Sequence, residues 1–422
     1  MTRFTPGLRG RWRPRRWVGP LREQVGLLYL VAGQASLVLL GYVTNVFVAR
    51  SLGPEETGRF GVVMSILTWI EVLIIDGAPQ ALRRYVAMRP QSARTIVLAT
   101  TPAQLRFALL VFAASFLSSP LLARALRDSS YTFLFQIAFL DVLLYAAYWY
   151  VNGVLHGLKR FGDLFWMITG YALGKCVLTI VLIGMGLRAE GALLANALAS
   201  AVGAAVGMAF VSRAQLGLSE WSEAEEFWSF SRWNVVYGLL TSLLPSVDLW
   251  CVRYFGTDYQ AGLYTVAGSI AKVPYFLALA FMSFALPSLA SQVGEVLHDG
   301  AALRRHWRAV HTSALLTFLP MVLLVELFAR PLIVILFGSA YLGALPILRI
   351  LFPGTVLYSF LLLENTRVMA IHGMVPTLRT VALTTVVTVV AVVYGAYRAG
   401  ALGAAMAFAS AMALGYVLAR RV

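Results

Sequence analysis

Apolar stretches long enough to cross a membrane recur along the whole chain, and they decide what it can fold into. A spanning helix needs about 20 mostly apolar residues, because the hydrocarbon core is about 30 Å thick. Of the 422 residues, 59% are hydrophobic and only 13% are charged, whereas about 25% are charged in a typical soluble domain. The sequence therefore predicts an all-α polytopic membrane protein with no sizeable soluble domain between its spans.

The length and spacing of these stretches predict twelve transmembrane helices. We place them at about residues 24–49, 57–80, 100–123, 131–155, 164–187, 189–212, 229–253, 260–288, 309–329, 342–366, 376–397 and 399–419. The further apolar segment PLIVILFG, at 331–338, is too short to cross, so we expect it to be interfacial or re-entrant. Pro245 and Pro274, inside predicted spans, free backbone carbonyls and permit bending there.

Positive charge is distributed unevenly between the two sides of the predicted spans. With the N-terminus in the cytoplasm, 22 of the 34 Lys and Arg residues fall on the cytoplasmic side and eight fall on the other. Cytoplasmic loops carry the excess of Lys and Arg, so both termini are predicted to be cytoplasmic. The net charge of +15 is then a topology signal and not a nucleic-acid footprint. We expect the basic tail 1–23 to lie against anionic lipid.

A short sequence pattern occurs twice in the chain. GRFGVVMSI at 58–66 and GLYTVAGSI at 262–270 share Gly-x-aromatic-x-Val-x-x-Ser-Ile. Upstream of each copy, the pattern Arg-x-x-Gly occurs at 50–53 and at 253–256. Both copies fall where the first hairpin of a six-span half turns, which indicates an internal repeat.

Six spans is an even number, so both halves start on the same side of the membrane and form parallel repeats. We predict a first lobe at 24–212 and a second lobe at 229–422, joined by a cytoplasmic linker at 213–228. Two six-helix lobes around a central cavity are typical of transporters.

Five stretches in this order resemble a known family. They are ARSLGPEETGRFGVVMSI (49–66), GAPQALRRYVA (77–87), VLHGLKRF (154–161), DLWCVRYFGTDYQAGLYTVAGSI (248–270) and LFARPLIVILFGSAYLGALPILRIL (327–351). In these stretches the chain resembles the Wzx-type polysaccharide or O-antigen flippases. These form part of the polysaccharide transport family within the multidrug/oligosaccharidyl-lipid/polysaccharide exporter superfamily.

The resemblance implies a function and a set of partners. It implies a flippase of the inner (cytoplasmic) membrane that moves an undecaprenyl-diphosphate-linked oligosaccharide by alternating access. The oligosaccharide would be an O-antigen, capsule or exopolysaccharide repeat unit. The implied partners are this lipid-linked oligosaccharide, the membrane lipids and a polysaccharide polymerase or assembly machinery. We expect the flippase to function as a monomer.

Charged residues inside predicted spans are the candidate functional residues, because such charges are costly and usually face a cavity or pair with one another. Asp141 and Lys175 lie at similar depth on consecutive helices, so we expect a structural ion pair, with a substrate or proton role as the alternative. Glu71 and Lys272 belong to different halves. The resemblance implies that their helices line the cavity, so we expect Lys272 to attract phosphate or acidic sugar and to contact Glu71 across the lobes.

Arginines near the span ends are weaker candidates. Arg50 and Arg253 occupy equivalent repeat positions and either guide phosphate or snorkel to the headgroups. Arg106 and Arg349 either extend a cationic wall of the cavity or snorkel and pair. We include Asp248 among the candidate cavity residues.

Several chemistries are missing from the sequence. It has no G-x-x-x-x-G-K-[ST] phosphate loop and no Cys/His cluster with metal-ligand spacing, so we predict no metal or cofactor. A polytopic lipid-linked glycosyltransferase is the less favoured alternative, because the acids are dispersed and the loops are short. A proton- or sodium-coupled drug exporter of the same superfamily is the other alternative, since the span count does not exclude it.

Overall fold

The computed structural model describes residues 21–279 and 300–421, and these residues form helices and turns without a strand. The elements are α1 (Leu21–Ile75), α2 (Ala78–Met88), η1 (Pro90–Ser92), α3 (Ala93–Ala125), α4 (Tyr131–Gly157), α5 (Phe161–Gly184), α6 (Ala189–Ser212), α7 (Ala224–Leu243), α8 (Val247–Phe255), α9 (Asp258–Ala271), α11 (Gly300–Leu336), η2 (Ser339–Ala344), α12 (Leu345–His372) and α13 (Met374–Arg421). Most of the predicted basic tail, and the part of the predicted eighth span beyond residue 279, lie outside the described residues.

The predicted all-α polytopic fold is confirmed. Among the described residues, nine helices are long and apolar enough to cross a membrane, or ten if the bent pair α7–α8 counts as one span. Two of the nine contain a non-helical break, α1 at Gly53 and α13 at Ala399 and Gly400. Dividing both helices at these breaks brings the described part of the chain to about twelve spans.

The chain reverses direction inside α1, at Gly53. This residue has φ 76° and ψ 176°, a region that glycine enters far more readily than residues with a side chain. Pro54 follows directly, and its fixed φ suits the first turn of the next helix. The segment 49–60 is therefore a tight helical hairpin, as its sequence predicts.

Two predicted spans and the short segment 331–338 differ in detail from the observed helices. The segment 331–338 is not re-entrant, because its first six residues continue α11 in spite of Pro331. The span predicted at 57–80 ends at residue 75, and α2 begins a separate helix at residue 78. The span predicted at 229–253 is broken at 244–246, beside Pro245, where α7 and α8 meet at 45°.

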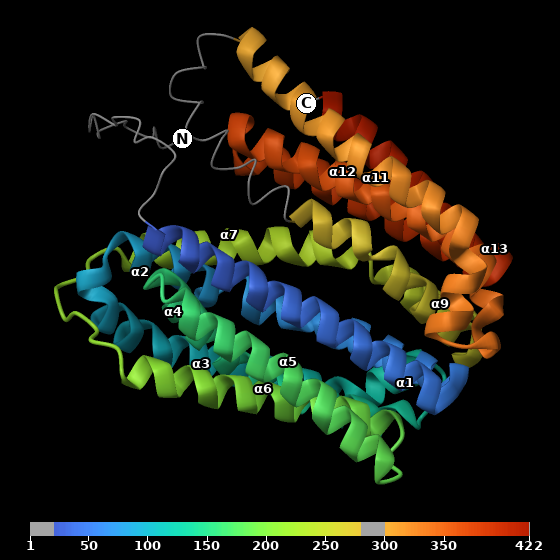
Figure 1. The fold of residues 1–422 in the computed structure, drawn as a ribbon, viewed down its shortest axis with the longest axis horizontal. Coiled ribbons are helices and arrows are strands. Elements are labelled where there is room, and N and C mark those ends of the chain that lie inside the picture. The colour runs from blue at the N-terminus through green and yellow to red at the C-terminus, as the bar shows by residue number, and fades with distance from the viewer. Residues whose placement is uncertain (1–20, 280–299, 422) are drawn as a thin grey trace.

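The helices lie in two groups (Figure 1). α1 to α6 form one group, α11 to α13 form the other, and α7 and α9 lie between them. The largest apolar core joins the two groups and includes Phe135, Leu263 and Phe408. A second, smaller core groups Phe227 of α7 with Leu82 and Tyr85 of α2.

Two ends of the molecule are used below. The hinge end is formed by residues 50–60, 126–131, 185–189, 253–262, 337–344 and 398–401. The linker end holds α2, residues 213–223 and the described C-terminus (Figure 1).

Candidate functional site

The two copies of the repeated pattern meet at the hinge end, through their first glycines. A Cβ atom on Gly58 would lie 2.0 Å from the carbonyl oxygen of Asp258, and one on Gly262 would lie 1.9 Å from that of Pro54. Real Cβ atoms do not come this close to a neighbour, so only glycine allows α1 and α9 to touch backbone to backbone here. The repeat thus marks the crossing of the two halves.

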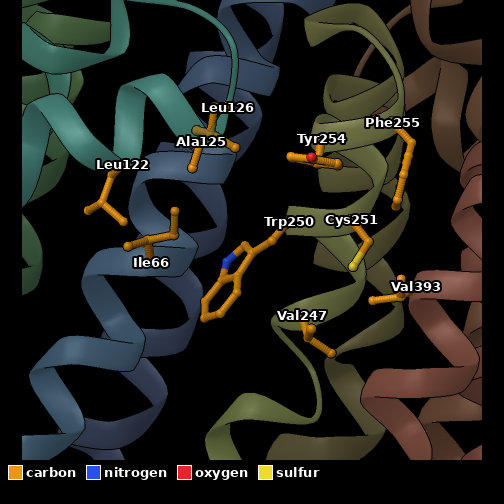
Figure 2. A pocket seen from close by; sticks show the side chains of 10 residues that line it. All are labelled: Ile66, Leu122, Ala125, Leu126, Val247, Trp250, Cys251, Tyr254, Phe255 and Val393. Carbon is orange, nitrogen blue, oxygen red and sulfur yellow. The ribbon is translucent and has the colours of Figure 1, made fainter.

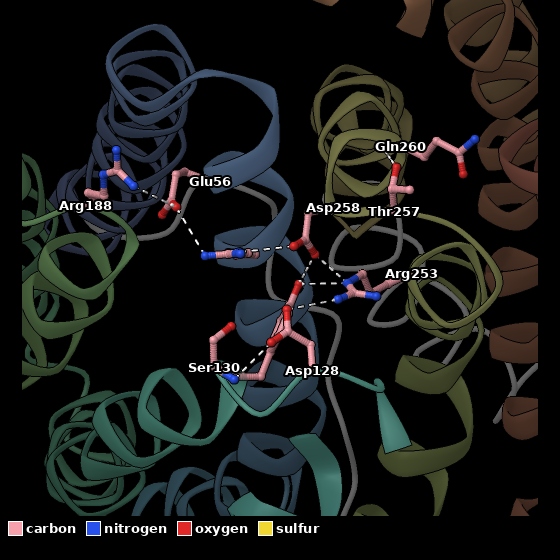
Figure 3. Close-up of polar contacts among 10 residues, drawn as sticks. Glu56, Asp128, Ser130, Arg188, Arg253, Thr257, Asp258 and Gln260 are labelled. Atoms are coloured by element: carbon pink, nitrogen blue, oxygen red, sulfur yellow. Dashed lines mark hydrogen bonds and ion pairs between the residues drawn. The ribbon is translucent and has the colours of Figure 1, made fainter. Parts of the chain in front are cut away.

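The carboxylate of Asp258 holds a polar network around this crossing (Figure 3). Arg59 Nε of α1 donates to Asp258 Oδ2 at 3.0 Å, and the Tyr131 hydroxyl of α4 donates to Oδ1 at 2.6 Å. Arg253 of α8 also pairs with Asp258. Its Nε donates to the Tyr131 hydroxyl at 3.1 Å. Asp258 and Arg253 keep only 13% and 10% of their side-chain surface exposed, so this network links the two halves largely out of water.

Asp128, in the turn between α3 and α4, extends the network. Its Oδ2 lies 3.4 Å from Arg253 Nη2, and its Oδ1 accepts a 2.9 Å hydrogen bond from the backbone N–H of Ser130. Partial burial opposes ionisation, but the hydrogen bonds from Ser130 and the charges of Arg59 and Arg253 outweigh it, so the pKa of Asp128 is lowered. The contact with Arg253 is therefore fully charged at neutral pH.

A second set of contacts at the hinge end joins the hairpin 49–60 of the first half to residues 335–341 of the second half. Arg50 of the first half donates to the backbone carbonyls of Leu336, at 2.8 Å, and Ile335, at 2.5 Å, at the C-terminus of α11. Tyr341 of the second half donates to the carbonyl of Ala49 at 2.7 Å. Its hydroxyl also lies 2.8 Å from Thr57 Oγ1. A positive charge at a helix C-terminus is favourable, so Arg50 fastens the hairpin to the other half.

The predicted partners Asp141 and Lys175 lie in one buried cluster with Glu71. The carboxyl groups of Glu71 and Asp141 lie close enough to act on each other. Lys175 lies close enough for its charge to act on both carboxyl groups. Asn196 of α6 donates to Asp141 Oδ2, whereas Asp141 Oδ1 and Glu71 Oε1 have no hydrogen-bond partner. Beside a charged amine, two carboxyls give a neutral cluster when one of them carries a proton, so this cluster can hold a proton or a small cation.

Glu71 and Lys272 are not brought together. Lys272 is exposed and lies at the turn after α9. Among the residues that the structure describes, the carboxylate of Asp248 is the charge that acts on it. Asp248 is buried and accepts hydrogen bonds from the Tyr264 hydroxyl at 2.7 Å and from the backbone N–H of Leu249 at 2.8 Å. In this conformation Glu71 interacts with Asp141 of the first half, and Lys272 interacts with Asp248 of the second half.

The two weaker candidates lie apart from these clusters. Arg106 is exposed on α3 between Leu105 and Phe107, which are exposed too, as expected for a lipid-facing arginine. Arg349 pairs with Glu326 at 3.5 Å, and about half of the arginine side chain is exposed. Neither residue adds a charge to the hinge-end network.

A small apolar pocket lies beside the hinge-end network (Figure 2). It has a volume of about 320 Å³ and separates Ile66 and Leu122 of the first half from Val247 and Val393 of the second. Trp250 points into it, and its Nε1 donates to Ser65 Oγ at 2.5 Å. The pocket can take a hydrocarbon chain but offers almost no polar group to a phosphate.

Comparison with known families decides the identity. Residues 25–293, more than half of the chain, match the family described as "Polysaccharide biosynthesis protein". The chain belongs to this family. A relative from Rhizobium meliloti (strain 1021), the succinoglycan biosynthesis transport protein ExoT, is 27% identical over 321 residues. That alignment covers 74% of this polysaccharide biosynthesis family member and 62% of ExoT, so the chain spans less than two thirds of the length of its relative.

Solved structures show the same fold. An inward-facing multidrug resistance MATE family transporter of the MOP superfamily has a TM-score of 0.77 at 16% identity, covering 94% of this chain and 97% of that one. The lipid II flippase MurJ, in an inward closed conformation, has a TM-score of 0.71 at 12% identity, covering 93% and 86%. These relatives are transporters and a flippase, not enzymes.

Proposed function

We propose that this member of the polysaccharide biosynthesis family is a flippase that carries a lipid-linked oligosaccharide across a membrane by alternating access. The carrying observation is the hinge-end closure, where the two halves exchange side chains around the glycine crossing of Gly58 and Gly262. A passage between the halves opens at this end only when these contacts break. The contacts are polar and local, as a reversible gate requires.

The moving parts of the proposed cycle are the lobes 24–212 and 229–422, with the linker 213–228 between them. The break between α7 and α8 supports bending at this point, because α7 packs on both halves, on α1, α2 and α13, whereas α8 packs mainly on α13. We place the linker end in the cytoplasm on the basis of the Lys and Arg distribution. The membrane would be the inner (cytoplasmic) membrane, with a monomer as the working unit.

The substrate would be an undecaprenyl-diphosphate-linked repeat unit, handed on to a polysaccharide polymerase or assembly machinery. Its diphosphate needs a cation that is not neutralised in a tight ion pair. Lys272 supports this role, because the residue is exposed and Asp248, the acid that acts on it, already accepts two hydrogen bonds. Arg50 and Arg253 are engaged in the closed hinge end and would meet a phosphate only after it opens.

Export of lipid-linked glycan in a strain that depends on this protein tests the proposal. Lys272→Gln should lower export at unchanged protein level, because the side chain stays polar and flexible but loses its charge. Lys159→Gln, at an exposed lysine in the turn between α4 and α5, is the matched control and should export normally. Normal glycan assembly in a deletion strain would refute the function, and normal export by Lys272→Gln would refute only the role of this residue.

The buried cluster of Glu71, Asp141 and Lys175 supports a second candidate, an ion-coupled drug exporter. Such a cluster can take up and release a proton or sodium ion during a cycle. Efflux of a cationic dye from proteoliposomes, driven by a proton or sodium gradient and lost in Glu71→Gln, would support this alternative. Gradient-driven movement of a lipid-linked glycan without dye efflux would exclude it.

A further inference from the structure

A second cavity, unrelated to the hinge end, opens at the linker end of the second half. It has a volume of about 710 Å³ and lies between α11, α12 and the end of α13. Its walls carry the aromatic rings of Trp307, Phe360 and Tyr416. Arg308, Arg367 and Arg420 also line it. The proposed transport path does not use it.

One buried carboxylate organises this cavity. Glu364 Oε1 lies 2.9 Å from His311 Nε2 and accepts a 3.3 Å hydrogen bond from Trp307 Nε1. Its Oε2 pairs with Arg367 Nε at 2.6 Å, and Arg367 Nη2 donates to the carbonyl of Ala419 at 3.2 Å. Glu364 thus links α11 to α12 directly and to α13 through Arg367, and its negative charge neutralises that of Arg367.

The remaining cations of the cavity are in excess. Among the described residues, neither Arg308 nor Arg420 forms an ion pair, and both are exposed; Arg420 contacts only the Tyr416 hydroxyl, at 3.5 Å. Three arginines against one glutamate leave these four groups with two net positive charges. A cavity with this charge is built to receive an anion.

The surface next to the cations is apolar, which defines the kind of anion. Thr312 follows Arg308 by one helical turn, and Leu315 and Leu319 continue the same face of α11. Both leucines are more than half exposed. A headgroup at Arg308 would therefore continue into hydrocarbon along α11, as in a membrane lipid lying against the protein.

We propose that this cavity binds the phosphate headgroup of an anionic phospholipid, with its acyl chain along Leu315 and Leu319. Basic pockets between transmembrane helices on the cytoplasmic side commonly bind such headgroups. A phospholipid fits better than the transported lipid, because every described residue that lines the cavity belongs to the second half.

Native mass spectrometry of the full-length protein, titrated with phosphatidylglycerol, tests this site. Each arginine near an anionic headgroup contributes about 1 kcal/mol. The double variant R308A/R420A should therefore bind about 30-fold more weakly. Arg398→Ala is the matched control, because Arg398 lies at the hinge end, beside the break in α13, and contacts Tyr394, four residues before it, as Arg420 contacts Tyr416. It should bind like the parent.

Other probes distinguish the sources of phosphate. Phosphatidylcholine and inorganic phosphate should bind far more weakly than phosphatidylglycerol. Thr312→Cys should react with maleimide more slowly when phosphatidylglycerol is present; both native cysteines are buried. Equal binding by R308A/R420A and the parent would overturn the proposal. So would undecaprenyl diphosphate outcompeting phosphatidylglycerol here, because the cavity would then belong to the substrate path.

Discussion

Asp258 is the group whose charge should matter most to the closed hinge end. Asp258→Asn keeps the size of the side chain and removes the charge that Arg59, Arg253 and Tyr131 share. A hydrogen bond to a charged group contributes about 1.5–3 kcal/mol, and a neutral one contributes about half as much. Allowing for the partial exposure of Arg59, we expect the closed state to lose about 2 kcal/mol, or about 30-fold in its ratio to the open state.

Electron–electron distance measurements across the hinge end report this ratio directly. Met185 in the first half and Arg398 in the second are both exposed. Cysteines placed there would carry spin labels, while the native cysteines are buried. A closed state favoured about 100-fold would open from about 1% to about a quarter of the molecules in Asp258→Asn. The variant should show a second, longer distance.

A matched variant separates this effect from a general loss of charge. Asp163→Asn removes an acid that pairs with Arg160 within the first half, at the start of α5. It should leave the hinge-end distance unchanged. Identical distance distributions in Asp258→Asn and the parent would refute the argument that this network holds the two halves together.

Three further perturbations address the same closure. Gly262→Ala should destabilise the closed state by about 1–3 kcal/mol through overpacking, whereas Gly268→Ala on the same helix, with its nearest neighbour 4.0 Å away, should not; spin-label distances separate the two. Arg50→Gln should speed proteolysis or labelling at the 49–60 hairpin, because the carbonyls of Ile335 and Leu336 lose a charged donor; unchanged rates would refute this anchoring role. The lowered pKa of Asp128 means that its contribution is complete above the ordinary value of about 3.9 and is lost as pH falls through the lowered pKa, so the hinge-end distance should stay constant from about pH 8 to about pH 5; opening within that range would contradict the assignment.

Much of the fold could be predicted from the sequence because the membrane restricts it. Spans of about 20 apolar residues leave few alternatives to helices, and the span 189–212 matches α6 residue for residue. Where the membrane does not dictate the backbone, the sequence is less informative. The run at 331–338 follows Arg330 and looks separate by hydropathy, yet its residues through Leu336 extend α11.

The partners of the buried charges were harder to predict. Depth along a span can be estimated from sequence, but the rotation of each helix cannot, and rotation decides what a side chain meets. Glu71 and Lys272 share a similar depth, and the structure turns them to different neighbours, Asp141 and Asp248. Asp258 was missed because it lies at a helix start, where an acid ordinarily complements the helix dipole. Its position four residues before the repeated glycine was the available signal.

The repeat itself explains why the hinge end should open as a unit. Arg50 and Arg253 are equivalent in the two halves, and each reaches the opposite half: Arg50 to the end of α11, and Arg253 to the turn after α3. Two tyrosines are equivalent in the same way. Tyr131 lies just after the turn that follows α3 and contacts Asp258 of the second half, and Tyr341 lies just after the end of α11 and contacts Ala49 of the first half. In an exchange of this kind, each contact has a counterpart related by the pseudo-twofold axis. Moving one half away strains both sets of contacts together. A partly open state would therefore lose contacts of both sets without being open, so we expect the hinge end to have two states, closed and open, with few intermediates.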